Sequence, residues 1–295
     1  MSAPRLFDRG LLAQRRARAR RGEPVRFLHD EIADRLAERV AEIRRDLASV
    51  LVLGPEAEVL ADRLSADRSS TVVTLEPDTG LGTEAALRVV GDDEVLPFAD
   101  ERFDAVVGGF GLHWVNDLPG VLIQLRRSLR PDGLLLLAFP GGNTLHELRE
   151  CLLDAELAVR GGAAARISPF VDVRDGGALL QRAGFALPVA DVERITVTYA
   201  DPLRLLADLR GMGQTNALVD RPRLGLSRQL VATACRTYVE RFGTADGRVT
   251  ATFEFLFLTG WKPAASQPKP LRPGSGTVDL RDVLGRGGSD EESGG

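Results

Sequence analysis

The segment from Arg102 to Gly142 constrains the fold of this chain more than any other. It opens with a largely apolar run at 103–107 and closes with a second at 134–139, as strands buried on both faces do. Between the runs, apolar residues recur at steps of three and four, which predicts one apolar helix face. Two parallel strands joined by a helix form a right-handed crossover unit. The segment therefore predicts an α/β sheet.

The same alternation of elements precedes this unit and predicts an open, mostly parallel, doubly wound sheet. The elements expected before it are an amphipathic helix at 28–47, strands at 49–53, 71–75 and 87–90, and a helix from 58 onward. Those expected after it are helices at 145–157, 172–183, 203–209 and 226–242 and strands at 195–199 and 249–259.

Length and composition are those of an ordinary water-soluble protein. The chain has 295 residues, 44% of them hydrophobic, and a formal net charge of −4. Because no apolar run approaches the roughly 20 residues of a membrane helix or resembles a signal core, we expect a cytoplasmic protein. Two cysteines cannot form a disulfide framework, and we expect buried free thiols. The predicted organisation is a basic arm at 1–26, a main domain at 27–262 with helical insertions near 145–184 and 202–242, and a flexible tail at 263–295.

The N-terminal arm is rich in arginine, with eight of them from Arg5 to Arg26 against only Asp8 and Glu23. Such an arm could bind an acidic partner, nucleic acid, or the inner face of the plasma membrane as a peripheral contact. It could equally be a solvated leader. The mild overall acidity argues against a dedicated nucleic-acid binder.

Acidic and glycine residues follow successive strands of the predicted sheet. Gly54 follows the first strand, Glu76 ends the second, Asp92 and Asp93 follow the third, and Gly109 follows the fourth. Ligands of doubly wound sheets bind beyond these carboxyl ends. A carboxylate there can accept from ribose hydroxyls, and another from an adenine amino group, which predicts an adenosine-containing cofactor. Each acid alone could also be a helix cap or a turn former.

His113 and Trp114 lie on the loop after the fourth strand and are the candidate catalytic residues. With His146, His113 could form a functional pair that acts as a general base or shares a metal. Alternatively, His113 caps a loop and Trp114 packs beneath a pocket. No metal site is expected from the three histidines and two cysteines, which form no cluster with ligand spacing; iron held by carboxylates is the alternative. The segment 211–216 could be a substrate lid or a plain loop.

Several short motifs connect the chain to a known family. They are LFDR at 6–9, LPF at 96–98, LHWVNDLP at 112–119, LRPDG at 129–133, GNTLHELR at 142–149, ISPF at 167–170, LRGMG at 209–213 and GWK at 260–262. With the order of elements, they resemble class I S-adenosylmethionine-dependent methyltransferases. More narrowly, the chain resembles the mitochondrial complex I assembly factor 5 family and its bacterial relatives, kin of the malonyl-acyl-carrier-protein methyltransferase of biotin synthesis.

The resemblance implies a seven-stranded Rossmann-like fold and S-adenosylmethionine as cofactor. It implies modification of a protein partner, a complex I subunit, by methylation or by arginine hydroxylation during assembly of respiratory NADH dehydrogenase. In its terms the catalytic residues are His113 and Trp114, and the cofactor-binding residues are those at the strand ends. A non-catalytic assembly factor that keeps the fold but has lost the cofactor is the alternative.

The first glycine motif departs from this family. Of its glycines only Gly54 remains, since Pro55, Glu56 and Glu58 follow. Pro55 removes an N–H donor, and the two glutamates would face the carboxylate of the cofactor. Two like charges about 4 Å apart repel by about 1 kcal/mol in water and by more when desolvated. The sequence therefore predicts weak cofactor binding.

Overall fold

The computed structural model describes residues 5–23, 25–55, 57–67, 70–76 and 86–268. Contacts divide the chain into two units, Met1–Pro263 and Ala264–Gly295, and the fold below is that of the first. Glu56, one of the three departures from the glycine motif, lies outside the described residues. Within the described ranges, no helix is long and apolar enough to cross a membrane.

A seven-stranded sheet organises the first unit, in the order β3-β2-β1-β4-β5-β7-β6. Neighbours from β3 to β5 pair in parallel, whereas β7 runs antiparallel to both β5 and β6. The strands are β1 (Ser49–Leu53), β2 (Thr71–Glu76), β3 (Leu87–Val90), β4 (Phe103–Gly108), β5 (Leu129–Pro140), β6 (Ala186–Tyr199) and β7 (Val249–Trp261). The predicted fold class, a doubly wound and mostly parallel sheet with helical additions, is confirmed.

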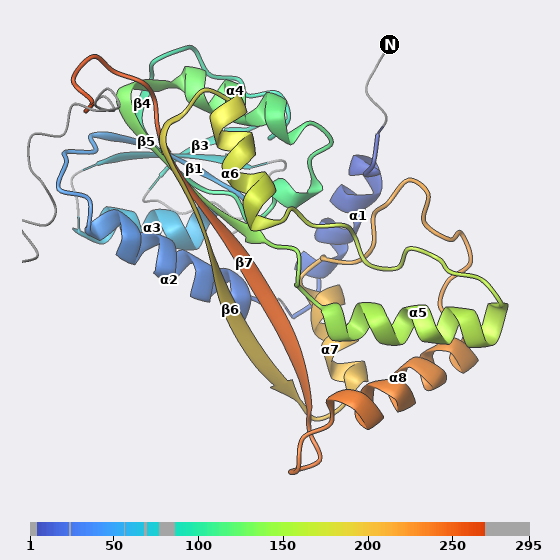
Figure 1. The fold of residues 1–295 in the computed structure, drawn as a ribbon. Helices are drawn as coiled ribbons and strands as arrows, with labels where there is room; N and C mark the ends of the chain where they lie inside the picture. The colour runs from blue at the N-terminus through green and yellow to red at the C-terminus, as the bar shows by residue number, and fades with distance from the viewer. Residues whose placement is uncertain (1–4, 24, 56, 68–69, 77–85, 269–295) are drawn as a thin grey trace, which may run out of the picture. The chain divides into compact units, whose positions relative to one another are not determined.

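Helices cover both faces of the sheet, as Figure 1 shows. They are α1 (Arg9–Arg20), α2 (Phe27–Ala41), α3 (Ala57–Asp67), α4 (Leu118–Ser128), α5 (His146–Arg160), α6 (Val173–Arg182), α7 (Pro202–Gly211) and α8 (Arg228–Phe242), with a short 3₁₀ turn η1 at Leu112–Trp114. Along β1, Val50 and Val52 pack into the core beneath α2 and α3, while Leu51 and Leu53 pack into the core beneath α4 and α6. This alternation explains why β1 reads as a continuous apolar run.

Local sequence signals set the helix starts. The carboxylate of Asp117 accepts from the backbone N–H of Gly120 and so caps α4. In α7, Asp201 caps the helix and Pro202 takes the first position, where its missing N–H costs nothing.

Three elements differ clearly from their predicted bounds. The strand expected at 134–139 is β5, which begins already at Leu129. The strand expected at 195–199 is β6, which begins already at Ala186. Its polar residues Asp191 and Glu193 hid it from the sequence pattern, and they are held by Arg39 of α2. The helix expected at 28–47 ends at Ala41, because the chain must turn back into β1. Leu47 nevertheless stays in the core.

The described part of the predicted basic arm packs against the rest of the unit. Phe7 and Leu12 are buried with Trp114, and the rings of Phe7 and Trp114 meet edge to face with centroids 5.1 Å apart. The backbone N–H of Asp8 donates to the carbonyl of Ala217 at 2.8 Å. Residues 5–20 thus lie against the loop after β4 and the segment after α7.

Candidate functional site

The ends of β1 and β4 approach each other closely at the centre of the sheet. Gly54, Gly108 and Gly109 have φ angles of +110°, +122° and +101°, which favour glycine. A Cβ on Gly108 would lie 2.2 Å from the carbonyl oxygen of Leu53, so no side chain fits there. The N–H of Gly109 donates to the same oxygen at 2.9 Å. That N–H is therefore engaged within the protein and does not face a ligand.

The predicted carboxylates gather along the same edge of the sheet, and each has an arginine beside it. Glu76, at the end of β2, is buried and lies 3.2 Å from Nη2 of Arg88. Arg9 of α1 donates to both Asp92, at 2.7 Å, and Asp93. Burial raises the pKa of Asp93, and the charge of Arg9 opposes that rise. Helix α1 thus neutralises two of the acids expected to bind a nucleoside.

A second arginine of α1 is buried where this edge meets the loop after β4. Arg16 is only 7% exposed. Its guanidinium lies beside Gly111, together with Pro55 and Asp93. A Cβ built on Gly111 would lie 3.3 Å from Arg16 Nη2, 3.4 Å from Pro55 Cδ and 3.8 Å from Asp93 Oδ2. Arg16 therefore connects the strand-end acids with the loop that carries His113.

S-adenosylmethionine fits one half of this edge better than the other. Glu76 and Asp93 are buried carboxylates at successive strand ends, as a ribose and an adenine require. The methionine half is less suitable, since Pro55 offers no N–H. Glu58 adds a carboxylate whose Oε1 is buried without a hydrogen-bond partner among the described residues. The nucleoside portion is where the residues suit the cofactor.

His113 and Trp114 occupy η1 and are both buried. Burial, reinforced by the positive charge of Arg16, lowers the pKa of His113 to about 3, although the backbone of Phe110 and the carboxamide of Gln214 oppose this. The imidazole is therefore neutral at physiological pH and can accept a hydrogen bond, but its low pKa makes it a weak base. The indole N–H of Trp114 donates to Oε1 of Gln214 at 2.6 Å.

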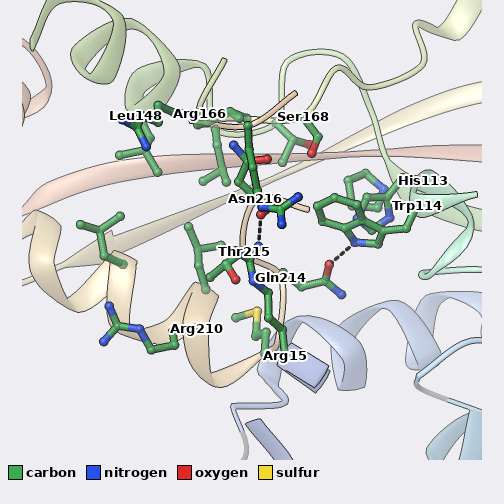
Figure 2. A pocket seen from close by; sticks show the side chains of 18 of the residues that line it. Arg15, His113, Trp114, Leu148, Arg166, Ser168, Arg210, Gln214, Thr215 and Asn216 are labelled. Atoms are coloured by element: carbon green, nitrogen blue, oxygen red, sulfur yellow. Dashed lines mark hydrogen bonds between the residues drawn. The ribbon is translucent and has the colours of Figure 1, made fainter. Parts of the chain in front are cut away.

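A cavity of about 700 Å³ opens beside these two residues. Its apolar lining comes from α2, β7 and the helices α5 and α7, through Leu28, Leu148, Leu209, Phe253 and Phe255 among others. Figure 2 shows His113 and Trp114 on one side of it, with Gln214, Thr215 and Asn216 beside them. The loop from Phe110 to Trp114 thus borders both the strand-end carboxylates and the cavity.

The segment 211–216 forms a wall of this cavity. A Cβ on Gly213, whose φ is +71°, would lie 3.0 Å from Cα of Arg16, so α1 packs directly against the segment. Arg15 donates to the carbonyl oxygen of Asn216. The contacts hold the segment closed against α1, and whether it opens as a lid stays a prediction.

His146 does not belong to this cavity. It begins α5, its ring meets the edge of Phe242 with centroids 6.1 Å apart, and its Nδ1 lies 3.4 Å from Glu147. The residues that line the cavity include His113 but not His146. The suggested pairing of the two histidines is therefore wrong. Among the described residues, no group of three or more His, Cys, Asp or Glu side chains could hold a metal ion.

Several residues at the site were not predicted individually from the sequence. His29 is buried in α2, with its ring centroid 4.3 Å from that of Phe110. Burial, with the charges of Arg16 and Arg26, lowers the pKa of His29 to about 3. Ser168 and Gln214 line the cavity from segments far apart in the chain. Arg9 lies within the motif LFDR, Ser168 within ISPF and Gln214 within the segment 211–216, but none of these patterns indicated a role for the individual side chain.

Comparisons with known proteins agree with this geometry. Residues 53–137 match the family described as methyltransferase domain. The chain is 38% identical to the human mitochondrial arginine hydroxylase NDUFAF5 over 290 residues, which cover 94% of this chain and 83% of the relative. It is 32% identical to the malonyl-[acyl-carrier protein] O-methyltransferase of Halorhodospira halophila over 284 residues, covering 92% and 93%.

Solved structures show the same fold. The YcgJ protein of Bacillus subtilis superposes with a TM-score of 0.54 at 15% identity, covering 79% of this chain and 99% of its own. A candidate methyltransferase of Bacillus halodurans gives 0.52 at 17% identity, covering 77% and 97%.

The sheet order, the glycines at its switch point and the matched domain define a class I S-adenosylmethionine-dependent methyltransferase fold. The chain belongs to that superfamily. Within it, the chain belongs to the family of the arginine hydroxylase NDUFAF5 and its relatives. The name of those relatives assigns them to mitochondria.

Proposed function

We propose that this protein uses its methyltransferase fold to modify a protein partner, by methylation or by arginine hydroxylation, during assembly of respiratory NADH dehydrogenase. The partner is a subunit of that complex. The observation that carries the proposal is the cavity of about 700 Å³, which shares the loop from Phe110 to Trp114 with the edge of strand-end carboxylates. A substrate side chain in the cavity would lie beside a cofactor held at that edge. Similarity to arginine hydroxylases over 94% of the chain supports the same conclusion.

The residues divide into two roles. Glu76 and Asp93 would hold the nucleoside of S-adenosylmethionine, which supplies a methyl group when bound. Gly54 and Gly109 keep the strand ends close enough for that edge to form. His113, neutral because it is buried, can accept a hydrogen bond from a substrate N–H or O–H; with a pKa of about 3 it would orient that group rather than take its proton. Hydroxylation would require dioxygen and a reductant in addition.

A non-catalytic assembly factor is the alternative, and two observations favour it. Pro55 lacks a backbone donor and Glu58 adds a side chain where the family has glycine, and Arg9 already neutralises Asp92 and Asp93. In this alternative the fold presents the cavity to a partner without chemistry. The cytoplasmic location and the contact of the arm with a membrane stay predictions.

Calorimetric titration with S-adenosylmethionine, and with S-adenosylhomocysteine for comparison, separates the two functions. Saturable binding is expected for the enzyme, and mass spectrometry of the complex subunits, from cells with and without this protein, should then show one added methyl group or one added oxygen atom. Absence of binding at millimolar ligand would leave the assembly factor. The Glu56→Gly/Glu58→Gly variant should bind more tightly if only the glycine motif limits affinity.

A further inference from the structure

Arginines surround the mouth of the cavity. Arg15 comes from α1, Arg210 from α7, and Arg221 and Arg223 from the segment between α7 and α8. In Figure 2, Arg15 and Arg210 lie below Thr215, on the side away from Arg166 and Ser168. We refer to these four as the mouth arginines. A fifth lining arginine, Arg166, is already paired with Glu156 at 2.5 Å and is not one of them.

Negative charge does not balance the mouth arginines. Among the described residues, the one acidic side chain that lines the cavity is Asp8, and it lies 3.3 Å from Arg221. Arg210 and Arg223 are exposed, and within the described part of the chain neither side chain forms a hydrogen bond or an ion pair. Burial and the nearby charge of Arg221 lower the pKa of Arg15. An anionic group at the mouth would relieve this crowding of positive charge.

The inner wall of the same cavity carries buried polar atoms without a well-formed hydrogen bond among the described residues, although Gln214 and the backbone of Phe110 lie beside His113. Nδ1 of His113, Oγ of Ser168 and Nε2 of Gln214 are buried and make no hydrogen bond within the described residues. Buried polar groups in folded proteins are almost always paired with protein or water. Because Oε1 of Gln214 accepts from Trp114, its Nε2 is fixed as a donor. In Figure 2 the three side chains come from different segments to one cavity.

These groups select for hydrogen-bond acceptors and negative charge. Ser168 and Gln214 can both donate, and the neutral imidazole of His113 can donate or accept. No carboxylate of the inner wall is available to receive a cation, since Asp8 is paired at the mouth. The positively charged guanidinium of a substrate arginine would be repelled by the mouth arginines. A peptide that carries such an arginine would bind only if acidic residues lie beside that arginine in its own sequence.

We infer that the cavity and its mouth arginines receive a carboxylate-rich segment of a protein partner. This inference rests on the proposed function only in taking the ligand to be a protein. The mouth arginines pair with the acidic side chains of the segment, and the inner donors hold an acceptor group on the side chain that enters. An arginine to be modified has no acceptor atom; it would be brought in by acidic residues on either side of it and would meet the neutral imidazole of His113 as its acceptor.

The test is a binding measurement that involves no cofactor. The probe is a short fluorescein-labelled peptide of alternating aspartate and glycine, titrated with the full chain and followed by anisotropy. The Arg210→Ala/Arg223→Ala variant should bind it roughly three- to tenfold more weakly, as two lost ion pairs of moderate strength predict. The same peptide with asparagine for aspartate should bind weakly to every form of the protein.

A matched control removes the same charge elsewhere. Arg204 and Arg236 are exposed on α7 and α8, make no described side-chain contact and do not line the cavity. The Arg204→Ala/Arg236→Ala variant should change affinity less than about twofold at the same salt concentration.

Three results would overturn the inference: equal binding of the asparagine peptide, an equal loss in the control variant, or tighter binding to vesicles of anionic phospholipid that depends on Arg210 and Arg223. Failure to bind S-adenosylmethionine would count against the proposed enzyme and leave this result unaffected. If the peptide fails to bind while partner modification is detected, the inference falls and the proposed function stands.

Discussion

Acid should destabilise this protein through two buried histidines, His29 and His113. Each is 7% exposed, and burial with the charge of Arg16 lowers the pKa of each to about 3. In the unfolded chain a histidine titrates near 6.5. Between these values the unfolded chain binds more protons than the folded one, so stability is full above pH 6.5 and is lost as the pH falls toward 3.

The size of the effect follows from the two pKa values. For one histidine, lowering the pH from about 8 to about 5 should reduce the free energy of unfolding by about 2 kcal/mol. The two histidines together should remove about 4 kcal/mol, out of a total that is typically about 5–15 kcal/mol for a folded domain. Asp93 acts in the opposite sense, because burial raises its pKa. Its contribution is shared by the variants below and cancels from their comparison.

Urea unfolding at a series of pH values between 5 and 8 measures this dependence. The His29→Leu variant should lose about half of it, because one titrating group is gone and the ring contact with Phe110 is replaced by an apolar one. Leu28→Ala, a cavity-forming change at the neighbouring buried position, should lower stability by about 2–5 kcal/mol at every pH without altering the slope.

A free energy of unfolding that stays constant within about 1 kcal/mol from pH 8 to pH 5 would refute the reasoning. So would a His29→Leu variant whose pH dependence equals that of the parent protein. Titration of the histidine ring signals by NMR gives a direct second reading. A His29 ring that protonates near pH 6 in the folded state would show that α2 and Phe110 do not exclude water from it.

Two further substitutions test the geometry around the strand ends. Gly108→Ala should lower the free energy of unfolding by more than about 3 kcal/mol, because its φ of +122° is strained for alanine and its Cβ would meet the backbone oxygen of Leu53. Thermal melting measures the loss. The control is Gly162→Ala, whose Cβ would have nothing within 4 Å and which should melt nearly as the parent does. Trp114→Phe should cost about 1–3 kcal/mol in urea unfolding, since it leaves Oε1 of Gln214 without its donor at 2.6 Å, and an unchanged stability would mean that water replaces the indole.

Much of the fold could be predicted from local pattern. Continuous apolar runs of the length of β1, β4 and β5 are buried on both faces, and the helix between β4 and β5 has one apolar face. The apolar pattern did not predict the first part of β6, because Asp191 and Glu193 interrupt it. Their partner, Arg39, lies on α2, 152 residues before Asp191. A strand whose charges are neutralised by a distant element has no signature within its own residues.

Part of the candidate site could likewise be predicted from the sequence, and part could not. The placement of Glu76, Asp92, Asp93 and Gly109 at strand ends follows from the order of parallel strands, which the sequence contains. The cavity does not follow from that order. It forms where α1 and the segment after α7 close over the loop after β4.

The sequence by itself determined that this protein is a doubly wound α/β sheet with acids and glycines along one edge, because periodicity and turn chemistry act over a few residues. Only the tertiary structure decided that Arg9 and Arg16 turn inward, that His29 joins His113 in a buried site, and that Ser168 and Gln214 face one cavity. Those contacts join residues far apart in the chain. Burial, and the shifts in pKa that follow from it, exist only once distant segments have packed together.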